Sequence, residues 1–339
     1  MSATPLTTLT TADLATGQEV RWCPGCGDLS ILAQLKKALA ESGVPREKLV
    51  FVSGAGCAGR FPYYLNTYGF HAIAGRAPTV ATGLKLLRPE LSVWVVTGDG
   101  DALSAGGNHL LHALRRNVDV KILLINNEVY GLAKGQASPT SRPGTRTRST
   151  PDGSFEYALR PLSVALAAGA TFVARSVDVD IDHLTETLIR TAAHKGSAFV
   201  EIYQNCKIFN DGVFDYASDK STKDENVLYL EHGRPLLYGN DQTRGIRLKG
   251  LEPELVKLGN GIEAEDLLVH NEAAERPTLA YLLSQMTYPD FPESVGVFRS
   301  VRRPTHDELT ERQIAEAIAR SGRGTLQELF EADDAWEVQ

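Results

Sequence analysis

The chain has 339 residues, 42% of them hydrophobic, and a formal net charge of −7. This length is typical of about two domains with a substantial buried core. The acidic balance excludes a general nucleic-acid or anionic-membrane surface, because either needs a dominant basic face. The first twenty residues lack the basic start and apolar core of a secretory signal, and no apolar run could span a bilayer. We therefore expect a cytoplasmic protein with no membrane or nucleic-acid partner.

A C-x-x-C pair, Cys23 and Cys26, stands just before the first expected helix, residues 29–42. The chain has only two other cysteines, Cys57 and Cys206. Disulfides are rare in a reducing compartment, so this spacing points first to metal or redox chemistry.

Short β-branched runs bounded by glycine predict five strands, at residues 49–56, 92–100, 121–131, 170–176 and 197–203. Helical patterns lie between them, at 108–116 and in a segment whose Leu184, Leu188 and Ile189 share one face. This alternation predicts an α/β fold with a mostly parallel sheet flanked by helices.

The regular pattern is interrupted by a long loop and fades toward the end of the chain. Residues 137–154 are rich in Ser, Thr, Pro, Gly and Arg, and loops of that length are often functional or mobile. After Cys206 the sequence becomes loop-rich and polar, so we expect an α/β domain at 1–206 and an extension at 207–339. That extension should end in one or two amphipathic helices with an acidic finish.

The motif Gly98–Asp99–Gly100 closes one strand and leads into a helix, where open α/β sheets bind ligands and where helix termini favour phosphate. Alone, it could also be a tight turn. Asn127 closes the next strand, so its side chain can meet that of Asp99. A carboxylate, an amide oxygen and a backbone carbonyl, with diphosphate oxygens and water, make the oxygen shell that Mg²⁺ prefers.

This pair of motifs resembles the diphosphate-binding half of thiamine diphosphate enzymes. The resemblance implies that Asp99, Asn127 and the carbonyl of Val129 hold Mg²⁺. It also implies a set of residues that contact thiamine diphosphate, largely through their backbone: Ala55, Gly56, Cys57, Ala58, Gly98, Asp99, Gly100, Asp101, Asn127, Val129, Gly131 and Leu132.

The predicted sheet also indicates how the four cysteines could come together. Cys57 and Cys206 stand at strand ends, which can converge, so Cys23, Cys26, Cys57 and Cys206 could form one set of four thiolates. Such a set suits a [4Fe-4S] cluster, although tetrahedral zinc uses the same ligands. The spacing alone does not choose the metal.

Six ordered motifs, "WCPGCG", "GAGCAGRFPYY", "GRAPTVATGLKL", "TGDGD", "INNEVYGLAKGQASPTS" and "EIYQNC", resemble the β subunits of 2-oxoacid:ferredoxin oxidoreductases, above all the 2-oxoglutarate type. The resemblance implies a [4Fe-4S] cluster on the four cysteines beside thiamine diphosphate and Mg²⁺. It implies reversible oxidative decarboxylation of 2-oxoglutarate to succinyl-CoA and CO₂, with coenzyme A as co-substrate and ferredoxin as electron acceptor.

Further assignments rest on single residues. Arg60 matches the family's basic residue for the oxoacid carboxylate, a task that suits its planar donor fork. His71 is a candidate to approach the cofactor, although a lone histidine is more often structural. Arg142, Arg146 and Arg148 could meet coenzyme A phosphates or a partner chain, although a solvated loop is the default.

One position departs from the family pattern. Where the family has "HGRA", with a histidine associated with the diphosphate, this chain has "AGRA", with Ala74. The loss of that donor weakens the cofactor expectation, and His71 is a conceivable substitute.

Only the diphosphate-binding half is present, so the family implies a separate α subunit that carries the activating glutamate and much of the coenzyme A site. We expect an αβ or (αβ)₂ assembly contacted by residues 207–339. Three alternatives stay open: the same chemistry on pyruvate or a branched-chain oxoacid, a non-oxidative thiamine-dependent decarboxylase with zinc on the cysteines, and a zinc-stapled interaction module without catalysis.

Overall fold

The computed structural model describes residues 9–331 and residue Trp336. The first eight residues of the expected 1–206 domain and most of the expected acidic finish lie outside the described residues. The helices are α1 (Asp28–Glu41), α2 (Ala77–Leu87), α3 (Gly107–Arg115), α4 (Pro161–Ala167), α5 (Ile181–Ala193), α6 (Asp215–Ser218), α7 (Lys223–Asn226), α8 (Thr278–Gln285), α9 (His306–Ser321) and α10 (Leu326–Phe330). The strands are β1 (Leu49–Ser53), β2 (Tyr68–His71), β3 (Ser92–Gly98), β4 (Val120–Asn126), β5 (Val129–Tyr130), β6 (Gln136–Ala137), β7 (Phe172–Val177), β8 (Ala198–Tyr203), β9 (Val227–Leu230), β10 (Leu237–Tyr238), β11 (Arg244–Lys249), β12 (Glu252–Lys257) and β13 (Glu293–Ser300).

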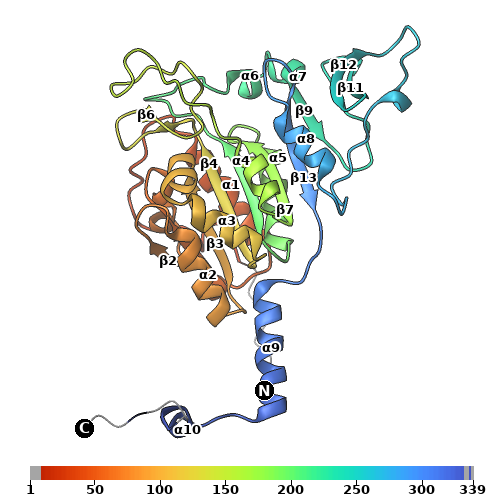
Figure 1. The fold of residues 1–339 in the computed structure, drawn as a ribbon. Coiled ribbons are helices and arrows are strands. Elements are labelled where there is room, and N and C mark those ends of the chain that lie inside the picture. The colour runs from red at the N-terminus through yellow and green to blue at the C-terminus, as the bar shows by residue number, and fades with distance from the viewer. Residues whose placement is uncertain (1–8, 332–335, 337–339) are drawn as a thin grey trace.

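One large sheet organises the chain (Figure 1). Its strand order is β2-β1-β3-β4-β8-β7-β13-β9, and the first six strands run parallel. All five expected strands lie in this parallel part, which confirms the predicted fold class. Parallel strands need crossover connections, and here helices supply them.

Helices cover both faces of the sheet because each strand is apolar on both sides. Val93 and Val95 of β3 belong to a core that includes Leu110 of α3 and Leu162 of α4. The alternating neighbours, such as Trp94, belong to the opposite core with residues of α1 and α5. The parallel strands thus form the middle of three layers, and their carboxyl ends share one edge.

The sheet does not end near Cys206, contrary to our expectation. β13 pairs antiparallel with β7, and β9 pairs parallel with β13 at the edge of the sheet. The polar pattern of residues 207–304 concealed these strands, because β9 has only four residues and its partner lies far along the chain. The domain boundary expected at residue 206 therefore has no counterpart in the main sheet.

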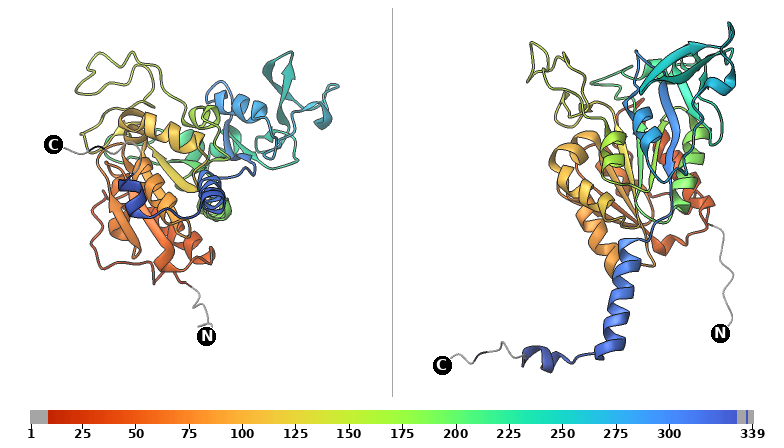
Figure 2. Two further views of the ribbon diagram at one scale, coloured as in Figure 1. Left: turned by 60° about the horizontal axis from the view of Figure 1, so that its bottom comes forward. Right: turned by 45° about the vertical axis from the view of Figure 1, so that its right-hand side comes forward.

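The rest of the C-terminal part contains a small antiparallel sheet, β10-β11-β12, and a projecting arm. The arm, defined here as α9 and α10, extends away from the body and agrees with the helices expected at the end of the chain (Figures 1 and 2). No helix within residues 9–331 is both long and apolar enough to cross a membrane.

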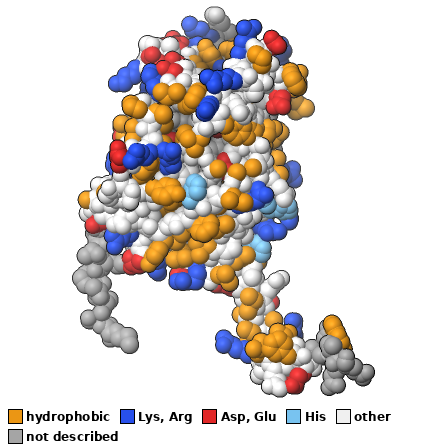
Figure 3. Space-filling model, turned by 90° about the vertical axis from the view of Figure 1, so that its left-hand side faces the viewer, with side chains coloured by type: hydrophobic (Ala, Val, Ile, Leu, Met, Phe, Trp, Pro, Cys, Tyr) orange, Lys and Arg blue, Asp and Glu red, His pale blue; other side chains and the backbone are white. Residues whose placement is uncertain are grey.

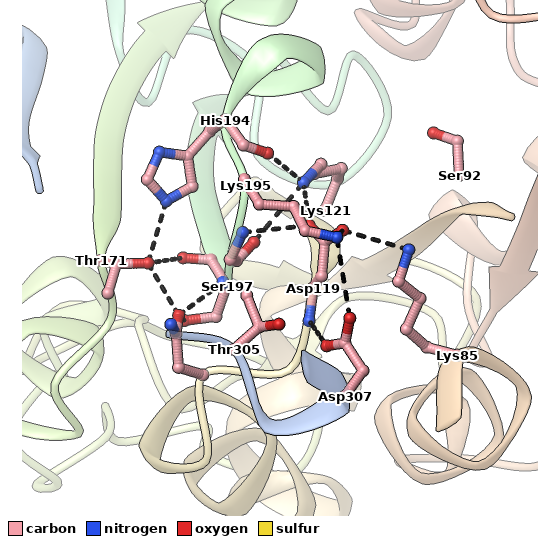
Figure 4. Close-up of polar contacts among 12 residues, drawn as sticks. Lys85, Ser92, Asp119, Lys121, Thr171, His194, Lys195, Ser197, Thr305 and Asp307 are labelled. Atoms are coloured by element: carbon pink, nitrogen blue, oxygen red, sulfur yellow. Dashed lines mark hydrogen bonds and ion pairs between the residues drawn. The ribbon is translucent and has the colours of Figure 1, made fainter. Parts of the chain in front are cut away.

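A buried ionic cluster holds the amino-terminal edge of the sheet together (Figure 4). The carboxylate of Asp119, just before β4, lies 2.6 Å from the ammonium group of Lys121, 3.1 Å from that of Lys85 and 3.0 Å from that of Lys195. The backbone N–H of Gly196 also donates to it. One carboxylate thus joins α2, β4 and the start of β8.

The same cluster anchors the arm. The Asp307 carboxylate accepts a hydrogen bond from the Asp119 N–H, and the Asn117 side chain donates to the carbonyls of Arg303 and Pro304. The Thr305 hydroxyl caps α9 by accepting a hydrogen bond from the Glu308 N–H, and the Glu308 carboxylate accepts one from the Thr305 N–H, which completes a capping box. The root of the arm is therefore fixed to the core, although every residue from Glu311 to Glu331 is exposed.

Asp119→Asn is expected to lower the free energy of unfolding by about 3–5 kcal/mol, because it leaves the buried ammonium groups of Lys85 and Lys121 without their counter-charge. Burial raises the pKa of Asp119, but the neighbouring lysines outweigh it and hold that pKa well below its usual range. The contribution is therefore complete above the unfolded value of about 3.9 and is lost as the pH falls toward the folded pKa.

Urea denaturation at pH 7 measures this loss. The control is Glu275→Gln, which removes an exposed ion pair with Arg303 and should change the free energy by about 1 kcal/mol or less. If both variants lost the same free energy of unfolding, the buried Asp119 cluster would not be the source of the stabilisation.

Candidate active site

A cavity of about 250 Å³ opens at the carboxyl ends of β1, β3 and β4. Its wall contains every residue that the sequence assigned to the cofactor: Ala55, Gly56, Cys57, Ala58, Gly98, Asp99, Gly100, Asp101, Asn127, Val129, Gly131 and Leu132. Three segments distant in sequence therefore meet where open α/β sheets bind ligands.

Small residues keep this cavity open. Gly56 has φ +96°, which favours glycine, and a Cβ added there would meet nothing within 4 Å. A Cβ on Gly98 would have only one neighbour, at 3.9 Å. At these two glycines the wall thus offers backbone and open space, which leaves room for a bound diphosphate.

Asp99 is a buried carboxyl held by hydroxyl groups. Its Oδ2 accepts from Ser138 at 2.5 Å and from Thr140 at 2.7 Å, both in the loop after β6. Burial raises the pKa of Asp99 to about 6, against the lowering effect of these hydrogen bonds. The loop after β6, expected to be long and polar, thus holds the carboxylate in place.

Asn127 is also fixed in orientation. Its Oδ1 accepts from the Val129 N–H at 3.2 Å, and its Nδ2 donates to Gln204 Oε1 at 2.8 Å. Asp99, Asn127 and Val129 all line the one cavity. A carboxylate, an amide oxygen and a backbone carbonyl make a donor set that fits a hard cation such as Mg²⁺.

Asp101 was expected to contact the cofactor. In the structure, its carboxylate accepts hydrogen bonds from three groups of the protein. Its Oδ1 accepts from the N–H groups of Ala55 and Gly75, at 3.1 and 2.7 Å, and its Oδ2 accepts from Thr97 at 2.6 Å. It lines the cavity but acts on the position of the loops around it.

The four cysteines come from three segments. Cys23 and Cys26 stand in a turn before α1, where Gly25 has φ +78°, while Cys57 follows β1 and Cys206 follows β8. The sulfur atoms of Cys57 and Cys206 both lie within 4 Å of the place where a Cβ on Gly131 would be. These two thiols therefore lie beside Gly131, which is part of the cavity wall.

Cys23 is exposed, whereas Cys26, Cys57 and Cys206 are half-buried. Burial raises the pKa of Cys26, and burial together with Asp28 raises the pKa of Cys57 to about 11. Within residues 9–331, no three His, Cys, Asp or Glu side chains form a group able to hold a single metal ion as they stand. The cysteines are therefore a loose set rather than a compact tetrahedral one.

Arg60 and His71 lie outside the wall of the cavity. The Arg60 guanidinium donates to the Arg21 carbonyl at 2.7 Å, in a separate surface depression. The His71 Nδ1 lies 2.9 Å from the Gly59 carbonyl and 3.0 Å from the Ser53 hydroxyl. Ala74 does line the cavity, so His71 does not occupy the place of the family histidine.

The three arginines of the long loop do not reach the cavity either. Arg142 bonds to the Glu128 carboxylate at 3.2 Å and to the Val213 carbonyl, while Arg146 and Arg148 are exposed.

Sequence reasoning missed several residues that shape the site. Asp28, beside Cys26, lines the cavity and is 1% exposed, and burial raises its pKa to about 7. Ser138 and Thr140 are short hydroxyl residues in the quoted "SPTS", which was a usable signal. Gln204 lies two positions before Cys206, and nothing local in the sequence distinguishes it.

Comparison with known proteins agrees with this geometry. Residues 54–202 match the family model described as "Thiamine pyrophosphate enzyme, C-terminal TPP binding domain". The chain is 50% identical over 329 residues to the 2-oxoglutarate oxidoreductase subunit KorB of Mycobacterium tuberculosis, covering 96% of this chain and 88% of that protein.

Two further relatives are more distant. The β subunit of 2-oxoacid:ferredoxin oxidoreductase 1 from Aeropyrum pernix is 47% identical over 190 residues, which is 56% of this chain and 60% of that one. A solved 2-oxoglutarate:ferredoxin oxidoreductase from Magnetococcus marinus, with 2-oxoglutarate, coenzyme A and succinyl-CoA bound, aligns with TM-score 0.71 and 29% identity over 94% of this chain and 92% of that one. On the strength of this similarity, the chain belongs to the family of 2-oxoacid:ferredoxin oxidoreductase β subunits.

Proposed function

We propose that the protein is the β subunit of a coenzyme A-dependent 2-oxoglutarate:ferredoxin oxidoreductase. The observation that carries this is the single cavity in which Asp99, Asn127 and Val129 meet the loop of Cys57. The relatives named for 2-oxoglutarate favour that substrate over pyruvate or a branched-chain oxoacid. The reaction would interconvert 2-oxoglutarate and coenzyme A with succinyl-CoA and CO₂.

Thiamine diphosphate and Mg²⁺ fit this cavity. Asp99, Asn127 and the Val129 carbonyl would hold the cation, while the small residues after β1 and β3 leave room for the diphosphate. The bound cofactor supplies the nucleophile and the electron sink for decarboxylation. The chain's own contribution is to fix the metal ligands through Ser138 and Thr140 and to exclude water from the buried carboxylate.

The four cysteines would hold a [4Fe-4S] cluster. A cluster accepts one electron at a time, which matches a ferredoxin acceptor. Four thiolates also suit tetrahedral zinc, but the relatives named as ferredoxin oxidoreductases favour the cluster. Free cysteines and ferredoxin-linked chemistry suit a reducing compartment, and we place the protein in the cytoplasm.

A β subunit implies an α subunit, and exposed apolar side chains support one. Tyr68 and Phe70 on edge strand β2, with Ile73 beside them, are each more than half exposed. Figure 3 shows hydrophobic side chains gathered on the arm, where Ile314 and Phe330 are exposed. Exposed apolar groups of this kind mark protein contacts. We propose that the α subunit completes the open cavity and that the arm contributes to an αβ or (αβ)₂ assembly.

Arg60 lies outside the cavity of this chain. We propose that it binds the substrate carboxylate only when the α subunit has completed the site.

Metal analysis tests the redox assignment. Anaerobically purified protein should contain about four iron and four sulfide per chain. About one zinc with no iron, in protein never exposed to air, would overturn the electron-transfer function and favour the non-oxidative decarboxylase.

Asp99→Asn should weaken Mg²⁺-dependent binding of thiamine diphosphate about a hundred-fold or more, because it removes the charged ligand of the cation. Calorimetry on the αβ complex measures this, and reduction of ferredoxin by 2-oxoglutarate plus coenzyme A should fall in parallel. Asp152→Asn, an exposed carboxylate in the long loop, is the control. Unchanged cofactor affinity in Asp99→Asn would argue against the magnesium site.

The wild-type complex tests the substrate. If it turned over pyruvate faster than 2-oxoglutarate, the substrate would be reassigned to pyruvate.

Ile314→Glu should weaken association with the α subunit about ten-fold or more, because it puts a charge on the apolar side of α9. The control is Gln313→Glu, at the neighbouring polar position. Sedimentation of mixed subunits gives the two dissociation constants, and equal values would remove the arm from the interface.

A further inference from the structure

Gln204 is a buried residue that touches both parts of the site. It follows β8 directly, is 1% exposed and lies two residues before Cys206. Its Nε2 donates to Cys26 Sγ at 3.1 Å and to the Asn205 carbonyl at 2.7 Å. Its Oε1 accepts from Asn127 Nδ2 at 2.8 Å.

The hydrogen-bond network determines which way this carboxamide faces. The Val129 N–H can only donate, so it fixes the oxygen of Asn127 on its own side. The Asn127 amino group must then face Gln204, which has to present its oxygen. The Gln204 amino group is left to face Cys26 and the Asn205 carbonyl. Reversing either amide would set two donors against each other.

We propose that Gln204 is a positioning residue that couples the iron–sulfur ligand Cys26 to the magnesium ligand Asn127. This inference rests on the proposed function, since it needs both a cluster and a cation. One amide would then serve two purposes, an N–H···S hydrogen bond to the cluster and the orientation of the Asn127 oxygen toward the cavity.

The hydrogen bonds of Gln204 to Cys26 and to Asn127 have different physical consequences. Reduction makes a cluster more negative, so a hydrogen bond to a ligating sulfur stabilises the reduced form and raises the potential. At the other end, partners that orient a metal ligand commonly change metal affinity by 10–100-fold. Gln204 should therefore affect cluster potential and cofactor affinity together, although it contacts neither substrate nor the diphosphate.

Two variants separate the two ends. Gln204→Met keeps a similar length but removes both the donor and the acceptor. Gln204→Glu keeps the acceptor for Asn127 and, when ionised, removes the donor to Cys26. Gln285→Met is the matched control, because Gln285 is a hydrogen-bonded amide that bonds to Ser163 and Arg160, away from the cavity.

The measurements use the anaerobically purified αβ complex, with iron content determined for every variant. An EPR-monitored titration gives the cluster potential, and calorimetry with Mg²⁺ gives the dissociation constant of thiamine diphosphate. In Gln204→Met we expect about a ten-fold less favourable reduction, ~59 mV for one electron, and about ten-fold weaker cofactor binding. In Gln204→Glu the potential should also fall while the cofactor affinity stays near the wild-type value. Gln285→Met should change neither.

Wild-type potential and wild-type cofactor affinity in a Gln204→Met protein with full iron content would overturn the coupling. If Gln204→Met assembles no cluster, the potential of Gln204→Glu decides, and a wild-type value there overturns the inference. Wild-type protein without iron would instead overturn the proposed function itself, so the two failures are distinguishable.

Discussion

The carboxylate of Asp101 is the interaction on which the geometry of the site depends. Its two oxygens take the N–H groups of Ala55 and Gly75 and the hydroxyl of Thr97. The loop that carries Cys57, the turn that carries Ala74 and the end of β3 are therefore fixed to one another. The fit is close, because a Cβ on Gly54 would stand 1.7 Å from Asp101 Oδ2 and one on Gly75 would stand 2.3 Å from the Ala105 backbone. Gly54 thus allows the loop to approach this carboxylate, and Gly75 allows its turn to pack on the backbone of Ala105.

Features that have a local sequence pattern could be predicted. Alternating strands and helices, and the placement of Asp99 and Asn127 at neighbouring strand ends, follow from residue types and spacing. It did not predict that β9 and β13 complete the main sheet, because pairing between distant segments leaves no local signal. It also missed Ser138, Thr140 and Gln204, which matter through hydrogen bonds to residues far away in the chain. Arg60 followed Cys57 at the expected spacing, yet its guanidinium reaches the Arg21 carbonyl instead of the cavity wall.

The open side of the cavity explains why family membership implies a second chain. The wall is built mainly from the strand ends of β1, β3 and β4 and the loops that follow them, and the cavity opens at this edge of the sheet. Around it, Leu132 on the rim and Tyr68 and Phe70 on β2 remain exposed, and burying such side chains is worth roughly 25 cal/mol per Å². At the opposite edge, the ionic cluster around Asp119 holds the root of the arm rigid while its apolar residues stay uncovered. A rigid root would lower the entropy lost in the proposed contact between the arm and the α subunit, because the helix is already formed.

Four residues at the end of β8, residues 203–206, lie next to both the cysteines and the proposed cation site. Tyr203 is the last residue of the strand, Gln204 bonds to both Cys26 and Asn127, Asn205 accepts from the Gly27 N–H, and Cys206 supplies a thiol. β8 itself pairs with β4, whose end carries Asn127. Any displacement of this strand end would move the cysteine set and the proposed cation site together. In the proposed function, the buried register of β4 and β8 would therefore set the distance between one cluster ligand, Cys206, and one cation ligand, Asn127.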